Sequence, residues 1–117
     1  MEISEAKIAI IGLGYVGLPL ARLFASKYPT IGFDRDTARV EALQKGIDMT
    51  EAVAEAHPAK DAKPRQLQYT DKVEDIRDCN FYIVTVPTPV DKDNHPDLSP
   101  LIEASSTIGK VITVGDV

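Results

Sequence analysis

The chain has 117 residues, of which 44% are hydrophobic and 26% charged, and its formal net charge is −5 at pH 7. This length and balance suit one soluble globular domain with a buried core, whereas the negative charge argues against a nucleic-acid partner, because tracking phosphates requires clustered Lys and Arg. A single cysteine, Cys79, excludes an internal disulfide, and the apolar stretch 8–21 is too short and too glycine-broken for a membrane span, so we expect a cytoplasmic protein.

The first strong pattern is a strand that runs into a glycine-rich turn and then a helix. The apolar run Ile8–Ile11 is typical of a strand that is covered on both faces. It is followed by Gly12, Gly14 and Gly17, and then by apolar residues at helical spacing. In this G-x-G-x-x-G pattern the first glycine permits the tight turn, the second lets a pyrophosphate approach the backbone, and the third lets the helix press on the strand.

This turn is a candidate anion site. The N–H groups of the first helical turn, at about 13–16, have no helical partners and lie at the positive end of the helix dipole. The predicted pyrophosphate-binding residues are Gly12, Leu13, Gly14, Tyr15, Val16 and Gly17. The alternative is an ordinary strand, turn and helix that bind no ligand.

A second predicted strand, Thr30–Phe33, ends on an acidic residue, Asp34. A carboxylate at this strand tip, about 20 residues after the glycines, accepts hydrogen bonds from the ribose hydroxyls of a dinucleotide. Asp36 is a good N-cap for a second helix that ends at Gly46. Arg39, in its first turn, either reaches back over the adenosine or is a solvated surface arginine, and the spacing leaves both open.

The middle of the chain is less regular. We expect a short helix over 51–56 and a proline-bearing loop in which His57 is solvated rather than a metal ligand, since it has no partner at ligand spacing. A strand over Leu67–Thr70 follows, and Asp71 is predicted to cap a brief helix that runs to Arg77. We predict no metal site in the chain.

The run 81–86 is the second strong strand, and a Pro-Thr-Pro loop follows it. Open α/β sheets bind ligands in the crevice outside the carboxyl ends of their strands, so Val86, Pro87 and Thr88 are predicted to line the cofactor. Cys79, just before this strand, is interpreted as a small packing residue and not a nucleophile. The polar run 91–97 is predicted to be a surface excursion with a solvated His95.

The last segment has a mixed pattern. Residues 111–114 look like a strand by composition, but apolar residues recur at helical spacing, so we predict one helix over 100–113 that is preceded by a cap at Asp97 or Ser99. The whole pattern predicts a truncated Rossmann-like, doubly wound parallel sheet of four strands in the order 3-2-1-4. The fourth strand would then be an open apolar edge through which we expect self-association.

The chain resembles the N-terminal cofactor-binding domain of the UDP-glucose/GDP-mannose dehydrogenase family. The motifs that carry the resemblance are Gly-Tyr-Val-Gly-Leu-Pro at 14–19, Asp34 with Arg39, and Val-Pro-Thr-Pro at 86–89. The stretch 96–105 is similar to the subgroup that acts on UDP-N-acetylhexosamines. The resemblance places Arg39 at the adenosine ribose, and the acidic Asp34 favours NAD over NADP, although Arg35 next to it is a residue type that can hold a 2′-phosphate.

The resemblance also implies an activity. In this family two hydride transfers to NAD oxidise the C6 alcohol of a UDP-sugar, such as UDP-N-acetylhexosamine or UDP-glucose, to the uronic acid for polysaccharide biosynthesis. The catalytic cysteine and lysine, the substrate domain and most of the homodimer interface lie beyond position 117. We therefore expect residues 1–117 to be the NAD-binding domain of a longer dehydrogenase, without catalytic residues of their own. The competing hypothesis is a stand-alone regulatory domain that senses NAD.

Overall fold

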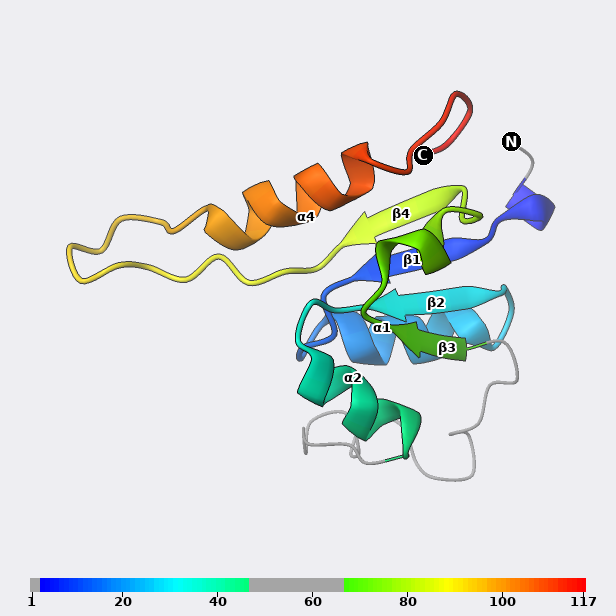
Figure 1. Cartoon of the computed structure of the whole chain (residues 1–117), viewed down its shortest axis with the longest axis horizontal. Coiled ribbons are helices and arrows are strands. Elements are labelled where there is room, and N and C mark those ends of the chain that lie inside the picture. The colour runs from blue at the N-terminus through cyan, green and yellow to red at the C-terminus, as the bar shows by residue number, and fades with distance from the viewer. Residues whose placement is uncertain (1–2, 47–66) are drawn as a thin grey trace.

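A four-stranded parallel sheet forms the centre of the computed structural model, which describes residues 3–46 and 67–117 (Figure 1). The strands are β1 (Ile8–Ile11), β2 (Thr30–Phe33), β3 (Leu67–Thr70) and β4 (Phe81–Val84). Their order in the sheet is β3-β2-β1-β4, which confirms the predicted 3-2-1-4 arrangement. The predicted helix over 51–56 and His57 lie outside the described residues.

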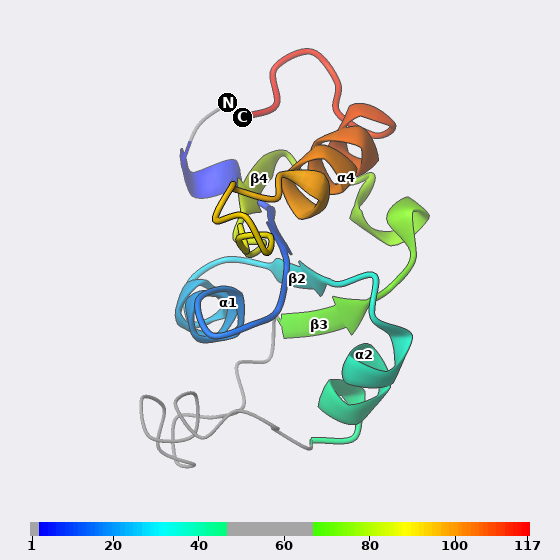
Figure 2. The same cartoon turned by 90° about the vertical axis from the view of Figure 1, so that its left-hand side faces the viewer.

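The helices pack on both faces of this sheet. They are α1 (Gly17–Ala25), α2 (Thr37–Gln44) and α4 (Ser99–Gly109), with short 3-10 helices η1 (Ile3–Glu5) and η3 (Val73–Ile76). Figure 2 shows α1 and α4 on different sides of the sheet. None of these described helices is long and apolar enough to cross a membrane.

The alternation of side chains along β1 builds two separate cores. Ile8 and Ile10 join a buried cluster with α1 and α2, whereas Ala9 and Ile11 join a cluster with η3 and α4. Successive strand residues face opposite sides of a sheet, so a strand between two helical layers needs an apolar residue at every position. All four residues of β1 and of β2 are buried, which explains the continuous apolar runs of the sequence.

The registers bring the ends of three strands to the same level. Ile11 pairs with Phe33 of β2 and with Val84 of β4. The ladder continues one step further, because the Gly12 N–H donates to the Phe33 carbonyl at 2.8 Å and the Thr85 N–H donates to the Ile11 carbonyl at 2.8 Å. The residues that follow these strands therefore meet at one edge of the sheet.

The ends of α2 follow the prediction. The Asp36 side chain accepts a hydrogen bond from the Arg39 N–H at 3.2 Å, which is the expected N-cap. At the other end Gly46 has φ of +83°, a left-handed conformation that glycine adopts without a steric penalty.

The predicted cap of the next helix is wrong. Asp71 does not cap η3; its carboxylate accepts a hydrogen bond from the Thr37 hydroxyl at 2.8 Å. The N-cap position belongs to Lys72, whose side chain makes no capping bond, and the Thr70 hydroxyl accepts from the Lys72 N–H at 3.1 Å and donates to Asp75. A hydroxyl that both accepts and donates satisfies two partners in this tight turn.

Helix α4 is shorter than predicted. It begins at Ser99, close to the predicted start, but its N-cap is Leu98 and not the predicted Asp97 or Ser99. Hydrogen bonding to Ser99, from its side chain and from its N–H at 2.9 Å, lowers the pKa of Asp97. The helix ends at Gly109 rather than at 113. The β-branched residues 111–114 are poor helix formers, and Val111 instead turns into the core, where 3% of it is exposed.

The segment after β4 extends from the sheet and doubles back (Figure 1). Val90 and Pro96 form an antiparallel bridge, and Asn94 near the tip has φ of +61°. The His95 side chain is 77% exposed, as expected for a surface excursion.

Strand β4 lies at the edge of the described sheet, but this edge is not wholly free. The Tyr82 N–H donates to the Val117 carbonyl at 2.7 Å, and the Val117 N–H donates to the Asn80 carbonyl at 2.9 Å. This is the pattern of a parallel ladder. The expectation of a fully open edge therefore needs correction at its amino-terminal half, while Val84 at the other end is 36% exposed.

We expect the chain to self-associate through the remaining edge, because unpaired strand N–H and C=O groups pair with other chains. A Val84→Lys substitution should shift sedimentation toward the monomer by placing a charge on that edge. Val114→Lys is the matched control, since Val114 is fully exposed outside the strands. A wild-type chain that sediments as a monomer at all concentrations would contradict the expectation.

Candidate cofactor-binding site

A cavity of about 360 Å³ opens where the strand ends meet. Its volume falls in the range of roughly 300–1,000 Å³ that is common for ligand pockets. Its walls come from the ends of β1, β2 and β4, from the start of α2, and from one face of α4. The lining residues are Ile11, Gly12, Leu13, Gly14, Phe33, Asp34, Arg35, Asp36, Arg39, Thr85, Val86, Pro87, Pro100, Glu103, Ala104 and Thr107.

The three glycines of the turn have three different surroundings. Gly12 has φ of +102°, which only glycine adopts readily. A Cβ on Gly17 would lie 1.7 Å from the Gly12 carbonyl oxygen and 2.4 Å from the Thr85 hydroxyl, so the helix can approach the strand only without a side chain there. A Cβ on Gly14 would meet nothing within 4 Å. That open backbone fits the close approach of a pyrophosphate.

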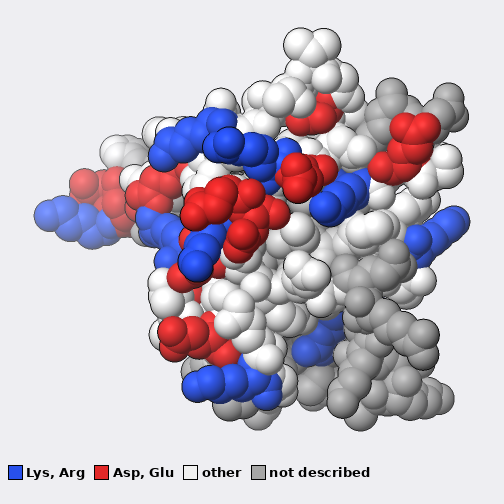
Figure 3. All heavy atoms as spheres, turned by 45° about the vertical axis from the view of Figure 1, so that its right-hand side comes forward, with Lys and Arg blue, Asp and Glu red and all other residues white. Residues whose placement is uncertain are grey.

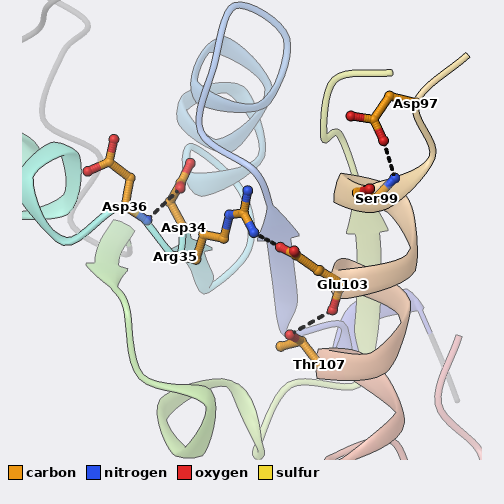
Figure 4. A network of polar contacts seen from close by, with 7 residues as sticks. All are labelled: Asp34, Arg35, Asp36, Asp97, Ser99, Glu103 and Thr107. Carbon is orange, nitrogen blue, oxygen red and sulfur yellow. Dashed lines mark hydrogen bonds and ion pairs between the residues drawn. The ribbon is translucent and has the colours of Figure 1, made fainter. Parts of the chain in front are cut away.

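Asp34 is held at the cavity by two backbone donors. Its Oδ2 accepts from the Leu13 N–H at 2.9 Å, and its Oδ1 accepts from the Asp36 N–H at 2.9 Å (Figure 4 shows the second bond). An ionised carboxylate has about four acceptor positions, so two remain for ligand hydroxyls. One expectation is corrected here: the Leu13 N–H is not free for a phosphate, and the Leu13 side chain is fully buried.

Arg39 reaches back to the glycine turn and is thus not a solvated surface arginine, while its place over the adenosine stays a prediction. Its Nε–H donates to the Leu13 carbonyl oxygen at 2.5 Å. Asp34 and Arg39 thus hold the N–H and the C=O of the same residue. The Nη2 atom of Arg39 is buried and has no hydrogen-bond partner among the described residues. A buried donor without a partner is costly, so this atom suits an acceptor supplied by a ligand.

Thr85, at the end of β4, is a site residue that sequence reasoning missed. Its hydroxyl donates to the Gly12 carbonyl at 2.7 Å and so ties the β4 end to the glycine turn. The signal in the sequence is a hydroxyl residue just before Val-Pro-Thr-Pro, inside an otherwise apolar run.

The structure brings most of the predicted site residues together, but not all. Of the residues after β4, Val86 and Pro87 line the cavity and Thr88 does not. Tyr15, Val16 and Gly17 also lie outside its lining, and Tyr15 is 73% exposed. Their part in cofactor binding stays a prediction.

Helix α4 supplies a wall that the sequence did not predict. Glu103, Ala104 and Thr107 face the cavity, and Glu103 forms an ion pair with Arg35 across it (Figure 4). The Thr107 hydroxyl donates to the Glu103 carbonyl at 3.0 Å.

Cys79 has no part in this cavity. It is buried in the core beside η3 and α4, and this burial raises the pKa of its thiol to about 11. A thiol with such a pKa is protonated at neutral pH and is a poor nucleophile. The structure therefore agrees with a packing role.

One face of the molecule carries side chains of both signs of charge. On the face drawn in Figure 3, acidic and basic side chains of the described residues are interspersed. Such a mixed surface gives no broad field that would attract a polyanion.

The sequence is also similar to that of known proteins. Residues 6–117 match the model of the UDP-glucose/GDP-mannose dehydrogenase family, NAD binding domain. The chain belongs to this family. As its NAD-binding domain, the chain has NAD as its cofactor, and the glycine turn, Asp34 and the open backbone at Gly14 fit that cofactor.

Several relatives are named as dehydrogenases of N-acetylated sugar nucleotides. The chain is 48% identical over 115 residues to UDP-N-acetyl-D-glucosamine 6-dehydrogenase of Salmonella typhi, a match that covers 98% of the chain and 26% of that protein. It is 47% identical over 106 residues to Protein CapL of Staphylococcus aureus, covering 91% and 24%. The solved UDP-D-ManNAc dehydrogenase of Pyrococcus horikoshii superposes with a TM-score of 0.80 at 33% identity, over 95% and 27%. The chain thus spans about a quarter of the length of these relatives.

Proposed function

We propose that this chain is the NAD-binding domain of a longer nucleotide-sugar 6-dehydrogenase, which oxidises the C6 alcohol of a UDP-sugar to the carboxylate. The observation that carries the proposal is the cavity in which the glycine turn, Asp34 and Arg39 meet. The names of the relatives favour a UDP-N-acetylhexosamine as the sugar, with UDP-glucose as the second choice. Uronic acids of this kind serve polysaccharide biosynthesis.

The residues of this chain bind and orient the cofactor in this proposal. The backbone at Gly14 and the start of α1 face the pyrophosphate, where N–H groups and the helix dipole favour negative charge. The Asp34 carboxylate accepts hydrogen bonds from the hydroxyls of the adenosine ribose. Val86 and Pro87 lie along the cofactor. Bound NAD supplies the hydride acceptor. Thr85 holds the glycine turn in place through the Gly12 carbonyl.

The chemistry on the sugar belongs to residues outside 1–117. The thiol of Cys79 is buried and protonated at neutral pH, so it is no candidate for a covalent intermediate. We propose that the catalytic thiol, the UDP-sugar site and a homodimer interface lie in the additional length that the relatives have. NAD and UDP-sugars are cytoplasmic metabolites, so the cytoplasm is the compartment that this function requires.

An activity assay tests the proposal directly. The chain of 1–117 should bind NAD in calorimetry but produce no NADH from UDP-N-acetylglucosamine, UDP-N-acetylmannosamine or UDP-glucose. The same assay on a chain extended by its own downstream reading frame should produce NADH, and omission of the sugar is the control. NADH formation by residues 1–117 alone would refute the proposal that residues outside this range catalyse the oxidation. A stop codon directly after Val117 would favour an NAD sensor.

A further inference from the structure

An ion pair spans the cavity between the end of β2 and helix α4. The guanidinium of Arg35, the residue directly after Asp34, contacts the carboxylate of Glu103 (Figure 4). Both residues line the cavity, and their side chains are 69% and 50% exposed. The pair thus lies beside the carboxylate that is proposed to bind the adenosine ribose.

The chemical type of Arg35 raises a question about cofactor choice. NAD and NADP differ only by a phosphate on the 2′ oxygen of this ribose, and an arginine near the end of the second strand accommodates that phosphate in NADP-binding domains. Arginine binds phosphate through two parallel N–H donors. In this chain those donors face a carboxylate of the same molecule.

We propose that Glu103 is a specificity-determining residue, which selects NAD over NADP by keeping Arg35 occupied. This inference rests on the proposed function, in which Asp34 binds the adenosine ribose. Glu103 acts twice: it neutralises Arg35, the cation that directly follows Asp34 and could receive a 2′-phosphate, and it adds a second negative charge to this part of the cavity. Without Glu103, Asp34 would still repel the 2′-phosphate, but the free guanidinium of Arg35 would attract it and offset that repulsion.

The exposure of the pair sets the size of the effect. Exposed ion pairs are weak and are screened by salt, so the pair can be broken without loss of the fold. Glu103→Gln keeps the size of the side chain and releases Arg35. We expect this variant to lower the quotient of the dissociation constants, NADP over NAD, by about three- to tenfold at low salt.

Calorimetry with NAD, and competition by NADP, measure this quotient. Arg35→Gln should move it in the opposite direction, because Glu103 then faces the 2′-phosphate without a partner. Glu41→Gln is the matched control, since it removes the same charge from an exposed residue of α2 that does not line the cavity. Its quotient should stay within about twofold of the wild type, as expected for a distant screened charge.

Three outcomes would overturn the inference. An unchanged quotient in Glu103→Gln shows that Glu103 does not control selectivity. An equal decrease in Glu41→Gln shows that the loss of any surface carboxylate has this effect, whether or not it contacts Arg35. Failure of the wild-type chain to bind either dinucleotide instead contradicts the proposed cofactor site itself, and the inference with it.

Discussion

Replacing Gly17 with alanine should destabilise the domain by at least about 3 kcal/mol, at the upper end of what overpacking usually costs. The new methyl group would lie 1.7 Å from the Gly12 carbonyl oxygen, where no carbon can fit. The carbonyl cannot move away easily, because the Gly12 N–H is bound to Phe33 and the carbonyl itself accepts from the Thr85 hydroxyl. Urea unfolding followed by far-ultraviolet circular dichroism measures the loss.

Gly14→Ala is the matched control for this substitution. Its methyl group would meet nothing within 4 Å, so the free energy of unfolding should change by less than about 0.5 kcal/mol. The same methyl group would occupy the place where the pyrophosphate approaches the backbone, so NAD affinity should fall. The two variants thus separate the packing glycine from the binding glycine. Equal stabilities of the two variants would contradict the packing argument.

The parts of the fold that the sequence predicted are those set by local patterns and by strand topology. The apolar runs at Ile8–Ile11 and Thr30–Phe33 are buried on both faces, and the glycine turn follows the first of them. Since parallel strands end at one edge of a sheet, Asp34 had to lie near Gly12. Their meeting in one cavity follows from this topology.

The parts that could not be predicted depend on how helices rotate when they pack. Burial of Ala104, together with burial of Val111 just after the helix, fixes the rotation of α4 and lets Glu103 reach Arg35. In α2 the burial of Val40 and Leu43 likewise directs Arg39 back to the Leu13 carbonyl, which excludes a solvated surface arginine. Side-chain spacing along one helix does not contain this information, because it comes from residues far apart in the chain.

The same limit explains the two local predictions that were wrong. Asp71 has the right residue type for a cap, but the Thr37 hydroxyl of another element binds its carboxylate. The helix over 100–113 stops early because Val111 gains more from burial in the core than from continuing the helix. In both cases a contact with a distant element outweighs a local preference of modest size.

Replacing Asp34 with alanine should weaken NAD binding by about 1.5–3 kcal/mol, which corresponds to roughly a tenfold to 150-fold increase in the dissociation constant. The substitution removes the proposed acceptor of the ribose hydroxyls. It also leaves the Leu13 N–H without the partner that it has at 2.9 Å, so Leu13 loses one of the two side chains that anchor its backbone. Titration calorimetry with NAD measures the change.

Two comparisons isolate the ribose contact from this effect on the turn. Arg39→Met removes the other anchor of Leu13, the bond to its carbonyl, and with Nη2 a donor that suits the ligand, so its urea unfolding and not its NAD affinity reports on the turn. Asp71→Ala removes an equal charge from a carboxylate that does not line the cavity, and it should change NAD affinity by less than about twofold. If Asp34→Ala binds NAD as tightly as Asp71→Ala does, Asp34 does not contact the ribose. If Asp34→Ala unfolds at the wild-type urea concentration and still loses NAD affinity, the loss comes from the ribose contact and not from the turn.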